Sequence, residues 1–85
     1  MSTWHVYILR CGDGSLYTGI SPDVEARLQA HQEGKGARYT RGRGPFELMY
    51  QETAGTQAEA TRRERAIKKL TRDQKQALIT RASNA

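Results

Sequence analysis

The chain has 85 residues, which suits one domain with a modest hydrophobic core and excludes a deep cavity for a large cofactor. Its 14 Lys and Arg outnumber 9 Asp and Glu, and a net charge of +5 favours a nucleic-acid partner because phosphate neutralisation releases counterions. Cys11 is the only cysteine, which excludes an intrachain disulfide and a Cys-rich zinc site. We see no signal peptide and no apolar run of transmembrane length, so we expect a cytoplasmic protein without a membrane partner.

The first two predicted elements form a β-hairpin. Residues 4–10 alternate over a β-rich composition, residues 16–20 read as a second strand, and the turn Gly12-Asp13-Gly14 lies between them. A three-residue turn with Gly14 in the left-handed region places Tyr7 opposite Gly19. That register puts Tyr7 and Tyr17 on the same face, whereas a two- or four-residue loop would put them on opposite faces.

A helix is predicted after the hairpin. Ser21 is the expected N-cap, with Pro22 in the first position and Asp23 in the first turn, and the helix runs to about Glu33 before Gly34 ends it. One face of this helix carries residues at i, i+3, i+4 and i+7, namely Val24, Arg27, Leu28 and His31. An arginine on a buried face must either extend to solvent or meet an anion.

A loop rich in glycine and arginine, residues 34–44, precedes a third strand over residues 46–52. The alternation of that strand predicts Phe46, Leu48 and Tyr50 on one face. Two further helices follow, from the capping box at Thr56 to about Leu70 and from a second capping box at Thr71 to about Ala82. The inward face of the first of these helices carries Ala60, Glu64 and Ile67, and the tail from Ser83 is expected to fray.

The element order β-β-α-β-α-α predicts an α+β fold, with a small three-stranded antiparallel sheet flanked by helices. We interpret residues 1–85 as a single domain, with a core over 4–70 and a C-terminal helix over 72–82.

Five features, in order, resemble the motifs of the GIY-YIG nucleases, and most of all their small stand-alone bacterial members. They are His5-Val6-Tyr7, Tyr17-Thr18-Gly19, Arg27 on the first helix, His31 four residues later, and Glu64 on a later helix. The sequence departs from the pattern at His5, where the family name has glycine, and at Thr18, where it has isoleucine. Some members carry a lysine where this chain has Ile20, and larger members have a further asparagine, for which Asn84 is a poor candidate.

This resemblance implies a metal-dependent endonuclease that hydrolyses DNA phosphodiester bonds in DNA repair or processing. The catalytic residues it implies are Tyr7, Tyr17, Arg27, His31 and Glu64, with a single Mg²⁺ or Mn²⁺ on Glu64. Arg27 would meet the phosphate oxygens as a planar fork. Either tyrosine would take a proton from water if its phenol pKa fell well below about 10, and His31 is a second base or leaving-group donor. The sequence leaves open which tyrosine is the base.

Basic and aromatic residues outside the motifs are expected to grip flanking phosphates or stack on an unpaired base: Arg38, Tyr39, Arg41, Arg43 and Lys68. We take a monomer as the default state, and a protein partner on which activity depends stays open.

Two other functions fit the same residues. The protein would be a nucleic-acid-binding module if the same surface binds nucleic acid but catalysis is absent or vestigial. It would be an interaction domain if Arg27 and Glu64 form only a structural ion pair.

Overall fold

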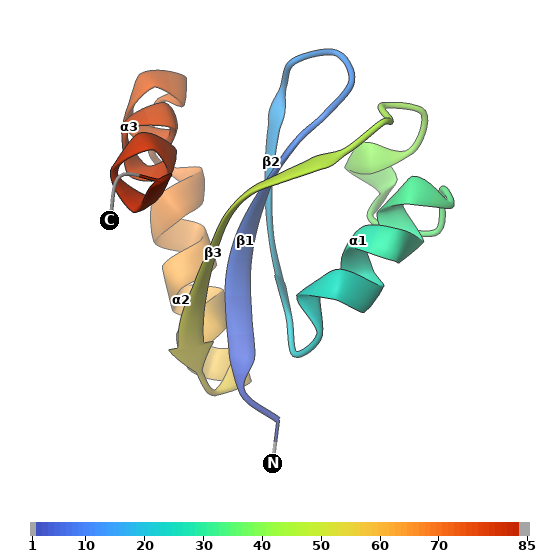
Figure 1. Cartoon of the computed structure of the whole chain (residues 1–85). Helices are drawn as coiled ribbons and strands as arrows, with labels where there is room; N and C mark the ends of the chain where they lie inside the picture. Colours follow the sequence, from blue (N-terminus) through green and yellow to red (C-terminus); the bar gives the residue numbers. More distant parts are fainter. Residues whose placement is uncertain (1, 84–85) are drawn as a thin grey trace.

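The computed structural model of the chain describes residues 2–83, and its order of elements confirms the predicted α+β fold (Figure 1). The elements are β1 (Trp4–Arg10), β2 (Leu16–Ser21), α1 (Val24–Gln32), the 3-10 helix η1 (Arg38–Thr40), β3 (Glu47–Gly55), α2 (Gln57–Lys68) and α3 (Arg72–Ser83). The three strands form one antiparallel sheet in the order β2-β1-β3. Ser83, where the sequence predicted that the tail begins, is the last residue of α3, and residues 84 and 85, Asn84 among them, lie outside the described residues.

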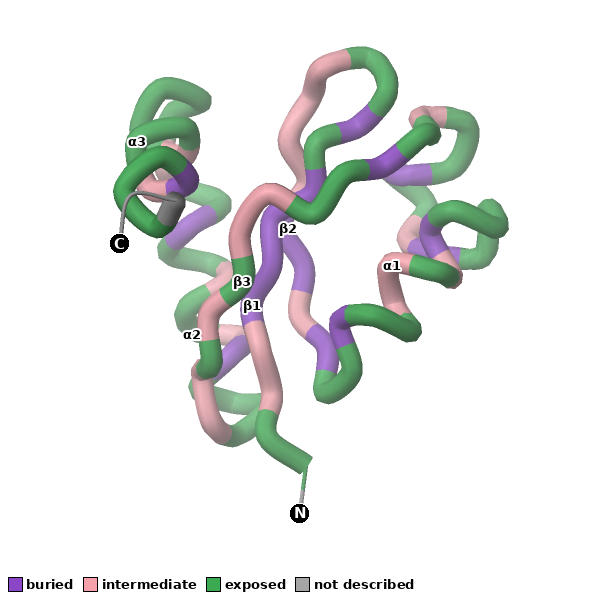
Figure 2. Tube along the Cα trace, viewed as in Figure 1, coloured by how far each residue is buried: buried purple, intermediate pink, exposed green. Residues whose placement is uncertain are grey.

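Helices cover both faces of the sheet, with α1 on one face and α2 and α3 on the other (Figure 1). The central strand β1 is therefore buried on both sides, as Figure 2 shows along most of its length. The side facing α2 and α3 holds a cluster of Val6, Ile8, Ala60, Ile67 and Ile79. The side facing α1 holds a cluster of Tyr7, Leu9, Cys11, Val24 and Phe46. Each fully buried Val, Leu or Ile side chain contributes roughly 1.5–3 kcal/mol to stability relative to the same side chain exposed.

The hairpin register is the predicted one. Tyr7 pairs with Gly19, and the turn closes with the Gly14 N–H donating to Cys11 O at 2.9 Å. Gly14 has a φ of 85°, the left-handed conformation that a three-residue hairpin loop requires. Because side chains alternate along a strand, Tyr7 and Tyr17 face the same side, and their ring centroids are 6.4 Å apart.

The N-cap of α1 is Asp23, and the prediction of Ser21 was wrong. The Asp23 carboxylate accepts the Ala26 N–H at 3.0 Å, while Ser21 Oγ accepts the Asp23 N–H at 2.9 Å. Ser21 thus orders the turn before the helix and remains the last residue of β2. Both residue types are good N-caps, and the strand pairing of Ser21 decides between them.

The C-terminal end of α1 has the geometry of a Schellman motif. Gly34 has a φ of 76° and its N–H donates to His31 O at 3.1 Å, while the Lys35 N–H donates to Ala30 O at 2.8 Å. Gly34 therefore ends the helix as predicted and leaves His31 in its last turn, facing the sheet.

Strand β3 starts and ends later than predicted, and its alternation is broken by a bulge. Leu9 pairs with Leu48 but Ile8 pairs with Tyr50, so Met49 is an additional residue at this point. The prediction that Leu48 and Tyr50 share a face was wrong because an extra residue reverses the alternation beyond it. Tyr50 consequently packs on the α2 side, whereas Phe46 packs with Tyr7 on the α1 side.

The last two helices begin at the predicted capping residues. The Thr56 hydroxyl accepts the Glu59 N–H at 3.1 Å, and Thr71 and Gln74 cap each other reciprocally at 2.9 and 3.2 Å. α2 ends at Lys68, two residues before the predicted Leu70. Among residues 2–83, no helix combines the length and apolar character needed to cross a membrane.

Thr18 yields a stability prediction, because its Oγ1 is the one buried side-chain nitrogen or oxygen of residues 2–83 that has no hydrogen-bond partner. Removing this hydroxyl in Thr18→Val should raise the free energy of unfolding by about 1 kcal/mol, measured by urea denaturation. The matched control is Thr40→Val, which should lower it because the Thr40 hydroxyl bonds both His31 and Ala37. A loss of stability in Thr18→Val would show that the hydroxyl has a partner.

Candidate functional site

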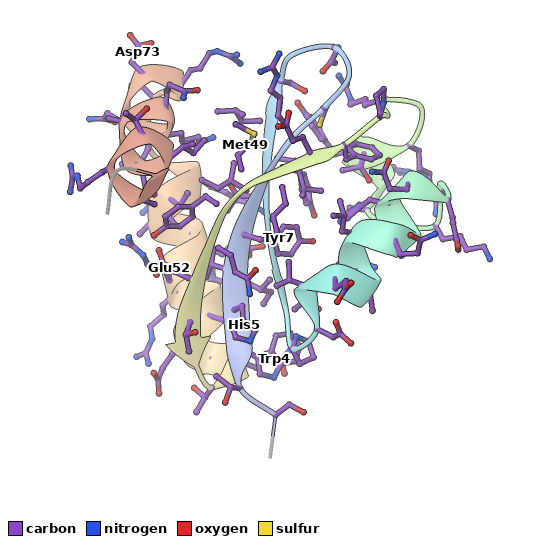
Figure 3. The ribbon with its side chains drawn as sticks, viewed as in Figure 1. Trp4, His5, Tyr7, Met49, Glu52 and Asp73 are labelled. Carbon is purple, nitrogen blue, oxygen red and sulfur yellow. The ribbon has the colours of Figure 1, made fainter. Side chains whose placement is uncertain are left out.

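The inner part of the candidate site is the phenol of Tyr7, which is 1% exposed and extends from β1 toward α1 (Figure 3). Its ring crosses the backbone of Gly19 on the neighbouring strand. A Cβ built on Gly19 would lie 2.5 Å from the Tyr7 hydroxyl oxygen and 3.0 Å from a ring carbon of Tyr17. Position 19 therefore has to be glycine for the two phenols to occupy the same face of the hairpin.

His31 is buried beneath these phenols and links two hydroxyl groups. Its Nε2 lies 2.9 Å from the Tyr7 hydroxyl, and its Nδ1 lies 2.8 Å from Thr40 Oγ1. The single proton of the Thr40 hydroxyl is donated to Ala37 O at 2.8 Å, since a carbonyl can only accept. Thr40 must then accept from the His31 Nδ1–H. The network assigns the Nδ1–H tautomer, which leaves Nε2 to accept the Tyr7 O–H.

The loop of residues 34–44 closes over the imidazole. Gly36 is buried against His31, and any side chain at this position would collide with His31 Nδ1. The sequence predicted that His31 faces inward, but it did not reveal Gly36 and Thr40 as its neighbours. Both lie in an irregular loop with no periodic pattern, so their contact with His31 exists only in the folded chain.

The two charged site residues come from opposite faces of the sheet. Arg27 lies on α1 and Glu64 on α2, yet the charge of each acts on the pKa of both Tyr7 and Tyr17. This is geometrically feasible because β2, which carries Tyr17, is an edge strand that side chains can reach from either side. The fold thus places one cation and one anion around the same pair of phenols.

Within residues 2–83, Arg27 and Glu64 form no ion pair with each other. The alternative in which these two residues form a structural ion pair therefore has no support from the structure. Glu64 is instead 3.6 Å from Lys68, one helical turn away, with its side chain 18% exposed. The neighbouring Arg63 pairs with Glu52 of β3 at 2.9 Å. The Glu64 carboxylate is therefore opposed by a flexible lysine, which is easier to displace than a bidentate arginine.

The inner site has three titratable groups, the phenols of Tyr7 and Tyr17 and the imidazole of His31, and all three are neutral at pH 7. Burial, followed by the nearby Tyr17 phenol, raises the pKa of Tyr7 to about 12, although Arg27 opposes the shift. Burial also raises the pKa of Tyr17, and burial together with the Arg27 charge lowers the pKa of His31. A tyrosine base requires a lowered phenol pKa. The protein alone does not provide one, because burial raises the pKa of each phenol more than the Arg27 charge lowers it.

The predicted nucleic-acid-binding residues divide into two groups. Tyr39 stacks on Tyr17 with ring centroids 5.8 Å apart, and the Arg43 guanidinium lies 4.4 Å from the Tyr39 centroid. Arg43 is further held by Asp13 at 2.5 Å and by Tyr39 O at 2.7 Å, so it orders the loop. The remaining residues are exposed cations, namely Arg38, Arg41 and Lys68.

Glu64 is the residue that the family resemblance implies as the metal ligand. Within residues 2–83, no group of three or more His, Cys, Asp or Glu side chains is placed to hold a metal ion. Glu64 is a carboxylate whose charge reaches both phenols. One carboxylate suits Mg²⁺, which keeps several waters and takes further oxygen ligands from a substrate phosphate.

The sequence of the chain also matches known proteins. The family model of the GIY-YIG catalytic domain matches residues 3–77. A UPF0213 protein of Staphylococcus epidermidis is 54% identical over 79 residues, covering 93% of this chain and 96% of that protein. A UPF0213 protein of Oceanobacillus iheyensis is 55% identical over 75 residues, covering 88% of this chain and 87% of that protein.

Two solution NMR structures share the fold. The UPF0213 protein BH0048 from Bacillus halodurans has a TM-score of 0.59 and 47% identity, covering 92% of this chain and 83% of that chain. The protein EF2693 from E. faecalis has a TM-score of 0.67 and 38% identity, covering 100% of this chain and 91% of that chain. The matched family model spans the segment that contains Tyr7, Tyr17, Arg27, His31 and Glu64, and the chain belongs to the GIY-YIG nuclease family.

Proposed function

We propose that the protein is a metal-dependent endonuclease that hydrolyses phosphodiester bonds in DNA with one bound metal ion. The observation that carries the proposal is the hydrogen-bonded series Tyr7–His31–Thr40, with the charges of Arg27 and Glu64 both acting on the Tyr7 phenol. Membership of the GIY-YIG family supports a nuclease and a nucleic-acid substrate. We further propose that it acts as a cytoplasmic monomer in DNA repair or processing.

Charge stabilisation is assigned to Arg27 and Glu64. Arg27 would bind the non-bridging oxygens of the scissile phosphate, where its fork geometry matches two oxygens at once. Glu64 would hold Mg²⁺ or Mn²⁺ after its contact with Lys68 is released. When bound, the ion would neutralise charge on the phosphate and assist departure of the leaving oxygen.

Proton transfer is assigned to the Tyr7–His31 pair. His31 is the neutral base, because its lowered pKa keeps the imidazole unprotonated near pH 7. The Tyr7 hydroxyl connects Nε2 to the site, so it would accept a proton from the attacking water while passing its own proton to His31. Tyr17 is half-buried whereas Tyr7 is buried, so we place the entry of water and substrate on the Tyr17 side. In this scheme neither tyrosine has to be a phenolate.

A second candidate is a non-catalytic nucleic-acid-binding module. The observation that favours it is the absence, within residues 2–83, of three clustered metal-ligating side chains. The two candidates separate on incubation with branched, single-stranded and duplex DNA. Binding without cutting in Mg²⁺ and in Mn²⁺ would assign the module, whereas cutting abolished by EDTA would assign the nuclease.

The charged residues give the first activity prediction. Arg27→Lys and Glu64→Gln should each lower kcat by about 100-fold or more, because each removes an interaction with the developing charge. The measurement is cleavage of branched DNA in Mg²⁺ at saturating substrate. The matched controls Arg62→Lys and Glu25→Gln change exposed residues on the same two helices and should stay near the wild-type rate. Cleavage that survives in both site variants would remove the assignment.

The pH profile should distinguish the proton relay from a phenolate base. Because burial and Arg27 hold the pKa of His31 below 6.5, kcat should fall only below that pH, as His31 becomes protonated. It should then remain flat to about pH 9, since Tyr7 stays protonated with a pKa of about 12. Cleavage rates measured from pH 5 to 9 check this. A rate that rises tenfold per pH unit throughout that range would instead identify a phenolate.

Substitutions of Thr40 test the assigned Nδ1–H tautomer of His31. Thr40→Val should reduce kcat by about tenfold or more, because the Nδ1–H of His31 loses its acceptor and Nε2 no longer stays free for Tyr7. Thr40→Ser keeps the hydroxyl and should recover most of the rate. Ring ¹⁵N chemical shifts of His31 report the tautomer directly and should show protonated Nδ1 in the wild type. Protonated Nε2 would contradict the assigned network.

A further inference from the structure

A cleft follows the open edge of β2, on the side away from β1. It has a volume of about 260 Å³ and is lined by Leu16, Tyr17, Thr18, Tyr39, Lys68 and Lys75. A second hollow of about 220 Å³ shares Leu16, Tyr39 and Lys75 with the first and adds Ser15 and Arg72. The two hollows therefore form one continuous groove between the loop that carries Tyr39 and the first turn of α3.

The lining of this groove is basic and aromatic. Its charged residues are Lys68, Arg72 and Lys75, and no carboxylate lines either hollow. Among the described residues 2–83, Arg72 and Lys75 form no ion pair, whereas Lys68 contacts Glu64 at 3.6 Å. Tyr39 is 45% exposed and borders these cations, with its ring stacked on Tyr17 and contacted by Arg43. Unpaired cations in a narrow groove suit the phosphates of a nucleic-acid strand.

The two unpaired cations lie at the amino end of α3, where the first turn also holds the acidic Asp73. The helix begins at Arg72, and its first turn is ordered by the reciprocal capping of Thr71 and Gln74. The amino end of a helix carries partial positive charge, and Asp73 offsets part of it. The backbone and the two cations together favour a phosphate in the groove.

The groove leads to the proposed catalytic residues. Tyr17 lines the groove, and its ring lies 6.4 Å from that of Tyr7 and 5.3 Å from that of His31, measured between centroids. A strand lying in the groove would therefore reach the Tyr7–His31 pair at one end and Arg72 at the other. The volume suits a sugar-phosphate unit of a single strand and is far too small for a duplex.

We propose that this groove is a phosphate-binding subsite for a single-stranded segment adjoining the scissile bond, with Arg72 and Lys75 as its phosphate ligands. The subsite rests on the proposed nuclease function and specifies its substrate class, namely DNA with an unpaired strand at the cleavage point. The specificity comes from contacts with backbone charge, so it selects DNA structure and not base sequence.

The test measures binding without chemistry. Fluorescence anisotropy in EDTA would give the affinity for a labelled duplex with a single-stranded overhang and for the same duplex with blunt ends. Arg72→Gln and Lys75→Gln should each weaken binding to the overhang substrate about threefold to tenfold. They should also lower the slope of log affinity against log salt by about 0.7, which corresponds to one phosphate contact with a single strand. Binding to the blunt duplex should change much less.

The matched controls are Arg62→Gln and Lys35→Gln, which remove the same charge from exposed positions outside the groove. Equal weakening in all four variants would reduce the effect to net charge and overturn the subsite, as would unchanged affinity in Arg72→Gln and Lys75→Gln. Wild-type cleavage in Mg²⁺ is measured in parallel. Cleavage with unchanged affinity in the variants overturns the subsite alone, whereas a wild type that neither binds nor cuts overturns the proposed function and the subsite together.

Discussion

The three-residue turn of the β1–β2 hairpin is the constraint on which the site depends. Its register pairs Tyr7 with Gly19 and puts both phenols on the face that α1 covers. A turn one residue longer or shorter would shift the pairing register by one residue and place the two phenols on opposite faces of the hairpin. The close approach of the Tyr7 ring to Gly19 reinforces this register, since any other residue there would displace the ring.

The sheet order has a second consequence for the site. Because β2 is at the edge, residues from both covering helices can act on the phenols, and the charges of Arg27 and Glu64 do so. If β2 were the central strand, neighbouring strands on both sides would keep the side chains of α1 and α2 apart. The same edge also leaves room for the groove that extends from Tyr17 to α3.

Burial determines the protonation states of the inner site. It keeps Tyr7 and Tyr17 protonated and His31 unprotonated, so the one group near neutral pH that can accept a proton is the imidazole. Thr40 then determines which imidazole nitrogen is available, because its own proton is committed to a carbonyl. A loop residue thereby orients the group that we propose as the base.

The sequence alone determined which strands and α-helices form, their order and the inward placement of His31, because these follow from local periodicity, capping and turn chemistry. Local patterns do not record contacts between distant segments. The Met49 bulge, the Tyr7–His31–Thr40 bonds and the groove joining Tyr39 to α3 are such contacts, and only the tertiary structure decided them. The same holds for the direction of the phenol pKa shifts, because burial is a property of the folded chain and here outweighs the neighbouring charge.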